Sequence, residues 1–475
     1  MTVTAGQVTT GRTTPSSPPF PATGPTCPAS PPRLADGIEL LGEYRDSGYS
    51  QPPSLVRRPD GQVIQMSPLL YRVTSRIDGS RDATAIAEIV SADLGRSLTA
   101  DQVRHLISTK LRPLGLISDQ GSPAAPPKAR PLLALRARGT LLPEPAANAV
   151  ALLLRPLFRW PVVAAVTVSF VGVDCWLFAS HALGAGLEEV LSNPICLLAV
   201  FGLSVLSGAF HECGHATGCR YGGARPGVIG VGIYLVYPSF FTNVTDSYRL
   251  SRAGKLRTDL GGVYFNAVFI LVLAGLYAAT SALILLLVIA ITQVEMLQQL
   301  IPVVRFDGYF ILSDLAGVPD MFARVVPIVK SVLRGGRLDP RVAGLRRGTR
   351  ILVTAWVLVV IPLLIAFMGY LLLHLPEINR ALWRSASLQG HLVATAVTGH
   401  HYAMAAVDAL SAALVSLSLV GMLYITTGLA RRVVTVARRW SAGRPSRRLV
   451  AGTAMVACAA TLAALWTVQG GFQGW

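Results

Sequence analysis

Residues 211–215 have the sequence His211-Glu212-Cys213-Gly214-His215 and lie inside an apolar run that extends from 194 to 219. On a helix, positions i and i+4 share a face, so both imidazoles can bind one metal ion, with Glu212 beside it as a general base. The spacing therefore predicts a catalytic zinc (Zn²⁺) site in a membrane helix. The alternative is a pair of histidines that hydrogen-bond to neighbouring carbonyls within a helix bundle.

The composition indicates an integral membrane protein. The 475-residue chain is 52% hydrophobic and only 14% charged, with a mean hydropathy of +0.51, which is more apolar than soluble proteins of this length. The fold class expected is mainly α, a polytopic membrane protein with about seven transmembrane helices. The apolar segments long enough to cross a bilayer are 157–179, 194–216, 262–280, 282–301, 351–373, 404–429 and 451–468.

The net charge of +17 is unevenly distributed along the chain. Strongly basic loops alternate with loops that carry few or no basic residues, as seven spans with a cytoplasmic N-terminus require. No signal-peptide pattern opens the sequence, so we expect the first 150 residues to be cytoplasmic and the protein to lie in the plasma membrane. The basic residues flank the spans and face anionic lipid, so no nucleic-acid partner is expected.

The region before the first span divides into three parts. Residues 1–35 are rich in Pro, Ser and Thr and are predicted to be a disordered tail. Residues 36–118 contain a hairpin pattern at 54–66, followed by three helical patterns, of which the last begins at Thr99 with Gln102 three residues on. This layout predicts a winged-helix (α+β) domain. Residues 119–150 are expected to form a linker with a short interfacial segment.

Four stretches of the 36–118 region resemble the PqqD-like domain, or RiPP recognition element, of ribosomal peptide pathways. They are Ser67-Pro-Leu-Leu-Tyr71, Ile77-Asp-Gly79, Ile86-Ala-Glu-Ile89 and Leu111-Arg-Pro-Leu-Gly-Leu116. The resemblance implies that the leader of a precursor peptide binds as an added strand on the hairpin edge, beside the third helix. The residues expected to contact the leader are Val63, Val103, Leu106 and Ile107. The alternative is a winged helix that binds DNA or only packs on the membrane domain.

A catalytic zinc site needs a third protein ligand, for which the best candidate is Asp307, just after the fourth span. In the alternating topology the C-terminal ends of spans two and four lie on the same side of the membrane, so His211, His215 and Asp307 can converge. Two histidines, one carboxylate and a water make a tetrahedral catalytic site. The alternative for Asp307 is an Asp-Gly turn or helix stop outside the membrane.

These motifs resemble the site-2 protease family of intramembrane zinc metallopeptidases, which pairs H-E-x-x-H with a later Leu-Asp-Gly. The chain has Phe306-Asp307-Gly308 in the second position, so the resemblance implies Asp307 as third ligand and Glu212 as the catalytic residue. It also implies a zinc metallopeptidase membrane core over 151–318. The apolar runs place a three-span membrane region over 319–475, which the resemblance does not cover. Gln299 stands where the family commonly has an oxyanion-binding Asn, and Asn266 belongs to a Gly-x-x-x-Asn element.

Residues 227–237 favour β structure and are too short to cross a bilayer as a helix. In the family, the corresponding region is a membrane-associated sheet whose edge can hold an unwound substrate; the alternative is a re-entrant hairpin that packs on the spans. Residues 242–249 and 306–314 further resemble a subgroup of peptide zinc metalloproteases found with peptide-modification genes.

The expected function is that of a zinc metalloendopeptidase that removes the leader from a ribosomally made precursor peptide. Daptide-type precursors are one candidate class, and peptide-modifying enzymes or an exporter are candidate partners. Two alternatives stay open. One is a regulatory site-2 protease that cleaves a membrane-anchored signalling protein, although no PDZ-like insertion is present. The other is a non-catalytic peptide-binding or export partner, which would not need Glu212.

Overall fold

The computed structural model describes residues 31–44, 46–59, 63–118, 136–180, 194–234, 237–333 and 339–472. Within these residues, seven helices are long and apolar enough to cross a membrane, which confirms the predicted polytopic membrane fold with seven spans. These helices are α5 (Trp160–Ser180), α7 (Pro194–Tyr221), α9 (Gly261–Thr280), α10 (Leu283–Leu300), α14 (Arg347–Leu373), α16 (Tyr402–Ser441) and α17 (Pro445–Phe472). The predicted disordered tail lies outside the described residues, apart from residues 31–35.

The chain divides into two compact units, one made of residues 1–36 and 72–125 and the other of residues 37–71 and 126–475. The first unit contains α2 (Ala83–Leu94), α3 (Ala100–Leu106) and a π-helical turn at Ile107–Leu111. The predicted cap of the third helix is present, because Thr99 and Gln102 form a reciprocal capping box. Helix α1 (Pro68–Ser75) crosses the boundary between the units.

The second unit begins with a three-stranded antiparallel sheet of order β1-β2-β3. Its strands are β1 (Glu39–Glu43), β2 (Ser54–Arg57) and β3 (Val63–Met66). The β2–β3 pair confirms the predicted hairpin, with Ser54 opposite Met66 and Arg57 opposite Val63, and its turn residues 60–62 lie outside the described part. The two units therefore separate the strands of the 36–118 region from its helices, although the sequence predicts one domain there.

A second antiparallel sheet has the order β4-β5-β6 and comprises β4 (Arg136–Leu142), β5 (Ile229–Tyr234) and β6 (Tyr237–Thr242). β5 and the start of β6 fall in the predicted β-favouring stretch. In the region expected to be a linker, 119–150, the described part forms β4 and the start of helix α4 (Glu144–Leu154), and residues 119–135 lie outside the described residues. β4 contains two arginines and a glycine, so its strand form depends on pairing with the distant β5.

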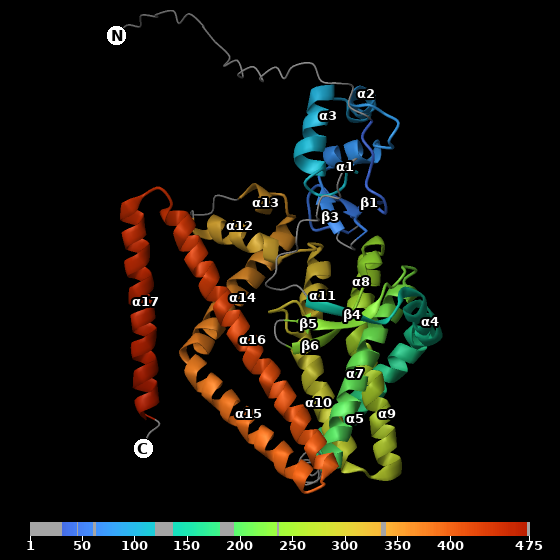
Figure 1. The fold of residues 1–475 in the computed structure, drawn as a ribbon. Coiled ribbons are helices and arrows are strands. Elements are labelled where there is room, and N and C mark those ends of the chain that lie inside the picture. The colour runs from blue at the N-terminus through green and yellow to red at the C-terminus, as the bar shows by residue number, and fades with distance from the viewer. Residues whose placement is uncertain are drawn as a thin grey trace, which may run out of the picture. The chain divides into compact units, whose positions relative to one another are not determined.

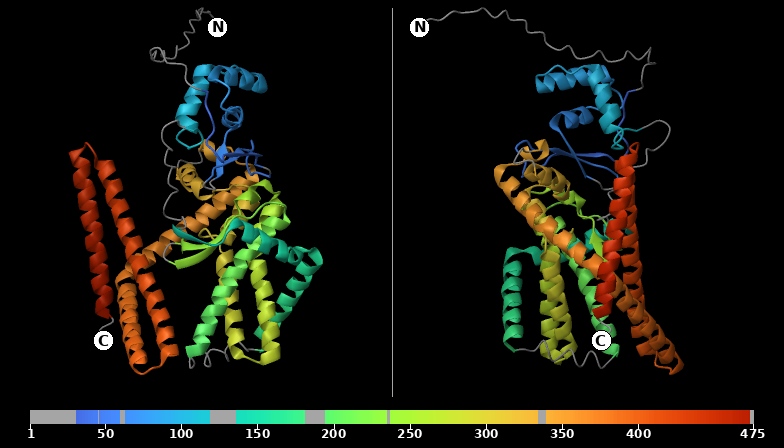
Figure 2. Two further views of the ribbon diagram at one scale, coloured as in Figure 1. Left: turned by 45° about the vertical axis from the view of Figure 1, so that its right-hand side comes forward. Right: turned by 90° about the vertical axis from the view of Figure 1, so that its left-hand side faces the viewer.

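The membrane core surrounds α9, which packs against α5, α7 and α10 (Figure 1; Figure 2). Their buried side chains form one apolar cluster that includes Phe269, Ile270, Leu286 and Ile289. Two shorter helices, α8 (Arg252–Asp259) and α11 (Asp307–Ala316), precede α9 and follow α10, respectively, and they contact each other. The core therefore places the end of α7 beside the short helices that carry polar residues.

The C-terminal region begins with α12 (Phe322–Leu333) and α13 (Pro340–Ala343), and the indole of Trp356 on α14 donates a hydrogen bond to the Pro302 carbonyl at 2.7 Å. The three spans predicted here are α14, α16 and α17. The structure adds a helix that the sequence analysis did not predict, α15 (Leu375–Thr398), which packs along α16. α16 has 40 residues; at about 1.5 Å per residue it is longer than the bilayer core is thick.

Candidate metal centre

His211, His215 and Asp307 converge although Asp307 lies about 90 residues further along the chain. The His211 Nε2 atom is 3.0 Å from His215 Nε2 and 3.1 Å from Asp307 Oδ2, and the His215 Nε2 to Asp307 Oδ2 distance is 3.4 Å. Atoms at the corners of a tetrahedron with zinc bonds of about 2 Å are separated by about 3.3 Å. The donor set and its spacing therefore fit one tetrahedral zinc ion with a fourth position for a non-protein ligand.

The Nδ1 atoms of the two imidazoles, which face away from the candidate metal position, have different surroundings. His215 Nδ1 lies 2.8 Å from the carbonyl oxygen of Thr258 on α8, so its N–H donates to that oxygen and leaves Nε2 with a lone pair for a metal. Among the described residues, the buried Nδ1 of His211 has no hydrogen-bond partner. The orientation of His215 therefore depends directly on α8.

Gly262 of α9 lies directly against both imidazoles. A Cβ atom on Gly262 would overlap His211 and would lie 2.6 Å from His215 Nε2. Gly214 of α7 and Gly261 of α9 face each other in the same way, and a Cβ on either would overlap the other's backbone. Only glycine therefore allows the two helices to approach closely enough for the histidines to lie between them.

Asp307 is the first residue of α11, which begins after Phe306 in extended conformation. A Cβ on the next residue, Gly308, would overlap the carbonyl of Leu300, so glycine lets α11 start against the end of α10. Burial opposes ionisation of the Asp307 carboxyl, but when His215 is protonated its charge, together with N–H groups of both imidazoles that face the carboxyl, outweighs burial and holds the pKa of Asp307 below the usual range. The carboxylate form needed for a metal ligand is thus favoured.

Glu212 is held by the second sheet. The hydroxyl of Thr242, the last residue of β6, lies 2.7 Å from Glu212 Oε2 and 3.0 Å from the Glu212 backbone carbonyl. Since a hydroxyl has one proton, it donates to one of these two oxygens at a time. β6 therefore limits the rotation of the Glu212 carboxyl beside the metal site.

The structure also brings the two predicted amide residues together. Asn266 is four residues after Gly262 on α9, and its Nδ2 donates to Gln299 Oε1 on α10 across 3.5 Å, a long hydrogen bond. Asn266 is 2% exposed, and its Oδ1 atom has no partner among the described residues. A buried amide oxygen without a partner indicates a position where another molecule can donate a hydrogen bond.

The predicted leader-contacting residues lie in both compact units. Val63 is half-buried on β3, in the second unit. In the first unit, Val103 is completely buried and Ile107 is 8% exposed, whereas Leu106 is half-buried. Val103 therefore belongs to the core of its unit, and Leu106 is the member of the three whose side chain a peptide can reach.

Sequence reasoning did not identify Thr242, the Thr258 carbonyl or Gly262 as parts of the site. Two of them stand in stretches that carry a signal, because Thr242 begins the 242–249 motif and Gly262 begins the Gly-x-x-x-Asn element. The role of the Thr258 carbonyl has no sequence signal, since any residue supplies a backbone oxygen. Such a partner becomes visible only when the helices are placed.

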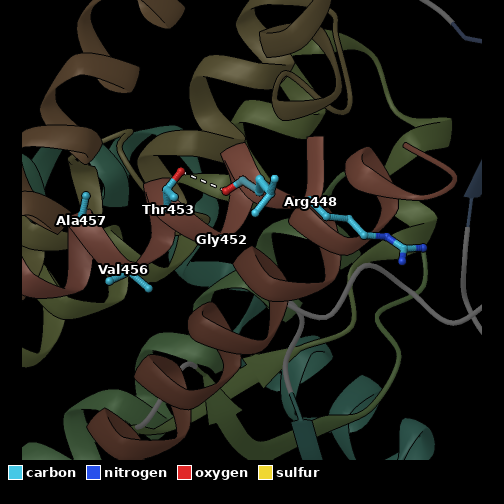
Figure 3. A pocket seen from close by; sticks show the side chains of 6 residues that line it. Arg448, Gly452, Thr453, Val456 and Ala457 are labelled. Carbon is cyan, nitrogen blue, oxygen red and sulfur yellow. Dashed lines mark hydrogen bonds between the residues drawn. The ribbon is translucent and has the colours of Figure 1, made fainter. Parts of the chain in front are cut away.

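Neither of two cavities in the described part of the chain is lined by His211, Glu212, His215 or Asp307. A hollow of about 580 Å³ lies on the surface of α17 (Figure 3) and is lined by that helix alone, by Arg448, Leu449, Gly452, Thr453, Val456 and Ala457. Its lining is almost entirely apolar apart from Arg448 and Thr453. This hollow therefore lacks a set of groups for catalysis.

The fold and the site together define a polytopic membrane protein with a candidate His-His-Asp metal centre. Over 110 residues the chain is 28% identical to the "Putative peptide zinc metalloprotease protein YydH" of Bacillus subtilis (strain 168), a match that covers 23% of this chain and 44% of that protein. The chain thus matches less than half the length of this relative. No family model matches the chain, and no solved structure matches it.

Proposed function

We propose that this protein is an intramembrane zinc endopeptidase of the site-2 protease type that cleaves a ribosomally made precursor peptide. The observation that carries the proposal is the group of three donor atoms separated by 3.0–3.4 Å, with the Glu212 side chain on the same helix as two of them. A zinc ion held by His211, His215 and Asp307 supplies a Lewis acid for the scissile carbonyl and for the attacking water.

In this proposal Glu212 is the catalytic base. Its carboxylate takes the proton of the attacking water and passes it to the leaving amine. The Thr242 hydroxyl, 2.7 Å from Oε2, holds the carboxylate in one orientation during both transfers. Because Oε1 of Gln299 accepts the hydrogen bond from Asn266, the Nε2 group of Gln299 remains the donor for the developing oxyanion.

The β6 strand is the proposed binding edge for the scissile segment. Among the described residues it pairs only with β5, and it ends at Thr242 next to Glu212. A peptide that adds to this edge is extended, so its carbonyl groups are exposed to attack, whereas a helical peptide hides them. An edge strand that leads to the general base thus explains how a substrate could unwind and reach the metal site.

The hairpin β2–β3 is the proposed recruitment site for the leader. β3 is the outer strand of its sheet, and a leader could extend the sheet by main-chain hydrogen bonds. Binding there raises the local concentration of the scissile segment, so the metal site itself can accept varied sequences. We further propose that this recruitment operates on the cytoplasmic side, as the distribution of basic loops predicts.

The test is co-expression of the full chain with the small peptide encoded beside its gene, followed by mass spectrometry of that peptide. Glu212→Gln should abolish leader removal while the purified variant keeps one zinc per chain. Glu144→Gln, at an exposed position at the start of α4, is the matched control and should process normally. Processing that persists in Glu212→Gln would contradict the proposal. A peptide left intact by the wild type as well would favour the regulatory protease or the non-catalytic partner.

A further inference from the structure

The connection between β1 and β2 contacts both short helices that flank the metal centre. We call Tyr44 and residues 46–50 the strap. The Asp46 carboxylate accepts a hydrogen bond from the backbone N–H of Arg252, the first residue of α8, and the Asp46 carbonyl accepts one from the Arg252 guanidinium, both at 2.9 Å. The N–H of Gly48 donates to the carbonyl of Gly317, which ends α11, also at 2.9 Å. The strap therefore joins the start of α8 to the end of α11.

The strap and α11 approach each other too closely for side chains. A Cβ on Gly48 would overlap the carbonyl of Ala316, and a Cβ on Gly317 would overlap the backbone N of Gly48 and lie 2.7 Å from the Asp46 carbonyl. Gly317 also has φ of 66°, a left-handed conformation that favours glycine. Such backbone contact leaves little freedom for α11 to move relative to the strap.

A buried polar cluster continues from the strap toward the metal centre. Tyr44 is 1% exposed, and its hydroxyl donates to Asp314 Oδ1 on α11 at 3.2 Å. The Lys255 ammonium of α8 lies 3.9 Å from the centre of the Tyr44 ring. The carboxyls of Asp314 and Asp259 interact electrostatically, and burial is the largest cause that raises the pKa of both. The cluster thus links α8 and α11 through buried polar side chains that both contact Tyr44.

The two ends of this cluster coincide with the supports of the metal centre. Asp314 is seven residues after Asp307 on α11, and Asp259 follows Thr258, whose carbonyl accepts the hydrogen bond from His215 Nδ1. A displacement of α11 would move Asp307, and a displacement of α8 would move the carbonyl that orients His215. The strap contacts both α8 and α11, so a shift of the strap would affect both metal-site supports.

We propose that the strap is a positioning element of the metal centre and that Tyr44 is its positioning residue, acting through Asp314 on Asp307 and through Asp259 and Thr258 on His215. The catalytic part of this proposal rests on the proposed function, whereas the effect on metal geometry does not. The strap is the covalent connection between β1 and β2, so the sheet β1-β2-β3 is built into the peptidase rather than attached to it. A peptide that binds this sheet can alter the metal site through the strap.

The test compares Tyr44→Phe with Tyr49→Phe in the full-length chain loaded with Co²⁺. Tyr49 is also in the strap, but its hydroxyl accepts a hydrogen bond from Arg324 on α12 at 2.7 Å. We expect Tyr44→Phe to bind Co²⁺ about tenfold more weakly, with shifted visible absorption bands, because partners behind metal ligands change affinity by about this factor. Tyr49→Phe should match the wild type. Equal spectra and equal Co²⁺ affinities for Tyr44→Phe and the wild type would overturn the proposal.

A second variant, at the other end of the Tyr44–Asp314 hydrogen bond, distinguishes loss of this bond from a general loss of stability in Tyr44→Phe. Asp314→Leu has a similar side-chain size and removes both oxygens that could accept from Tyr44, so it should reproduce the spectral shift of Tyr44→Phe. In leader cleavage, both variants should lower kcat about tenfold with little change in KM. If the wild type binds Co²⁺ and both variants show the shifted spectrum, but the wild type cleaves no precursor, the proposed function fails and the strap proposal stands. If the wild type cleaves and both variants retain its kcat and spectrum, only the strap proposal fails.

Discussion

The two antiparallel sheets have the same number of strands, yet they meet the metal centre in different ways. The sheet β4-β5-β6 contacts the candidate site directly, because the Thr242 hydroxyl of β6 hydrogen-bonds to Glu212, the proposed general base. The sheet β1-β2-β3 reaches the site only through the strap, which contacts α8 and α11. The difference teaches that the role of a sheet follows from which groups its residues contact, since topology and strand number are the same in both.

The largest effect on metal binding and activity is expected at Gly262 of α9, which faces both imidazoles and belongs to neither sheet. Gly262→Ala places a methyl group against both imidazoles, so the variant should bind no zinc and lose activity by at least about a thousandfold. Metal content of the purified protein and leader cleavage are the measurements. Gly275→Ala on the same helix is the control, because a Cβ there has no atom within 4 Å. If the Gly262→Ala protein bound zinc and were active, the metal site could not lie at the α7–α9 contact. The two sheets could then not be compared by their distance from that site.

A smaller effect should separate the sheet that contacts Glu212 from the one that does not. Thr242→Val removes the hydroxyl that donates to Glu212, and we expect kcat to fall about 10-fold to 100-fold while zinc stays bound. Thr242→Ser retains the hydroxyl and should recover most of the activity. Steady-state kinetics with parallel zinc analysis decides the result. Full activity in Thr242→Val would show that β6 contributes no more to the reaction than β3 does.

The smallest effect should come from the ion pairs on the first sheet. Arg57 of β2 lies 2.6 Å from Glu39 and 3.7 Å from Asp246, and Arg249 also contacts both carboxylates. Because Arg249 remains, Arg57→Gln should lower the free energy of unfolding by less than about 1 kcal/mol and change kcat by less than about twofold. A fall in kcat as large as that of Thr242→Val would mean that this sheet, too, acts directly on the reaction.

The same ion pair gives a pH dependence. The hydrogen bond from Arg57 holds the pKa of Glu39 below its ordinary value against the opposing effect of burial. A lowered pKa in the folded state stabilises the fold at neutral pH, and this contribution is lost as the pH falls through that pKa. Denaturant unfolding of wild type and Arg57→Gln should therefore differ at pH 7 and converge in acid. A difference that grows in acid would show that Arg57 stabilises the fold in another way.

Local sequence patterns were sufficient for much of the fold. The seven spans follow from continuous apolar runs, and the Thr99–Gln102 capping box and the β2–β3 hairpin follow from residues that are neighbours in sequence. The joint position of His211 and His215 needs only the helical repeat. These features were predictable because each depends on interactions within a few residues.

Features that depend on distant partners were not predictable in this way. β4 has no apolar alternation of its own and becomes a strand by pairing with β5, about 90 residues later. The contacts of Thr242 with Glu212 and of Thr258 with His215 join separate elements, and Gly262 is required only because α7 lies against it. The convergence of Asp307 was anticipated from topology and family resemblance, and the geometry is consistent with it, whereas its role as a ligand stays a prediction until metal is measured.

The contact between Gly214 and Gly261 limits how fast α7 and α9 can move apart. With backbone against backbone, no side chain lies between α7 and α9 at this point that could rotate aside to widen the site. Side-chain rotations take picoseconds to nanoseconds, but displacement of whole helices or strands takes microseconds to milliseconds. Widening the space between these two helices therefore requires a slow, collective displacement, and in the proposed peptidase no change in the catalytic groups would accelerate that step.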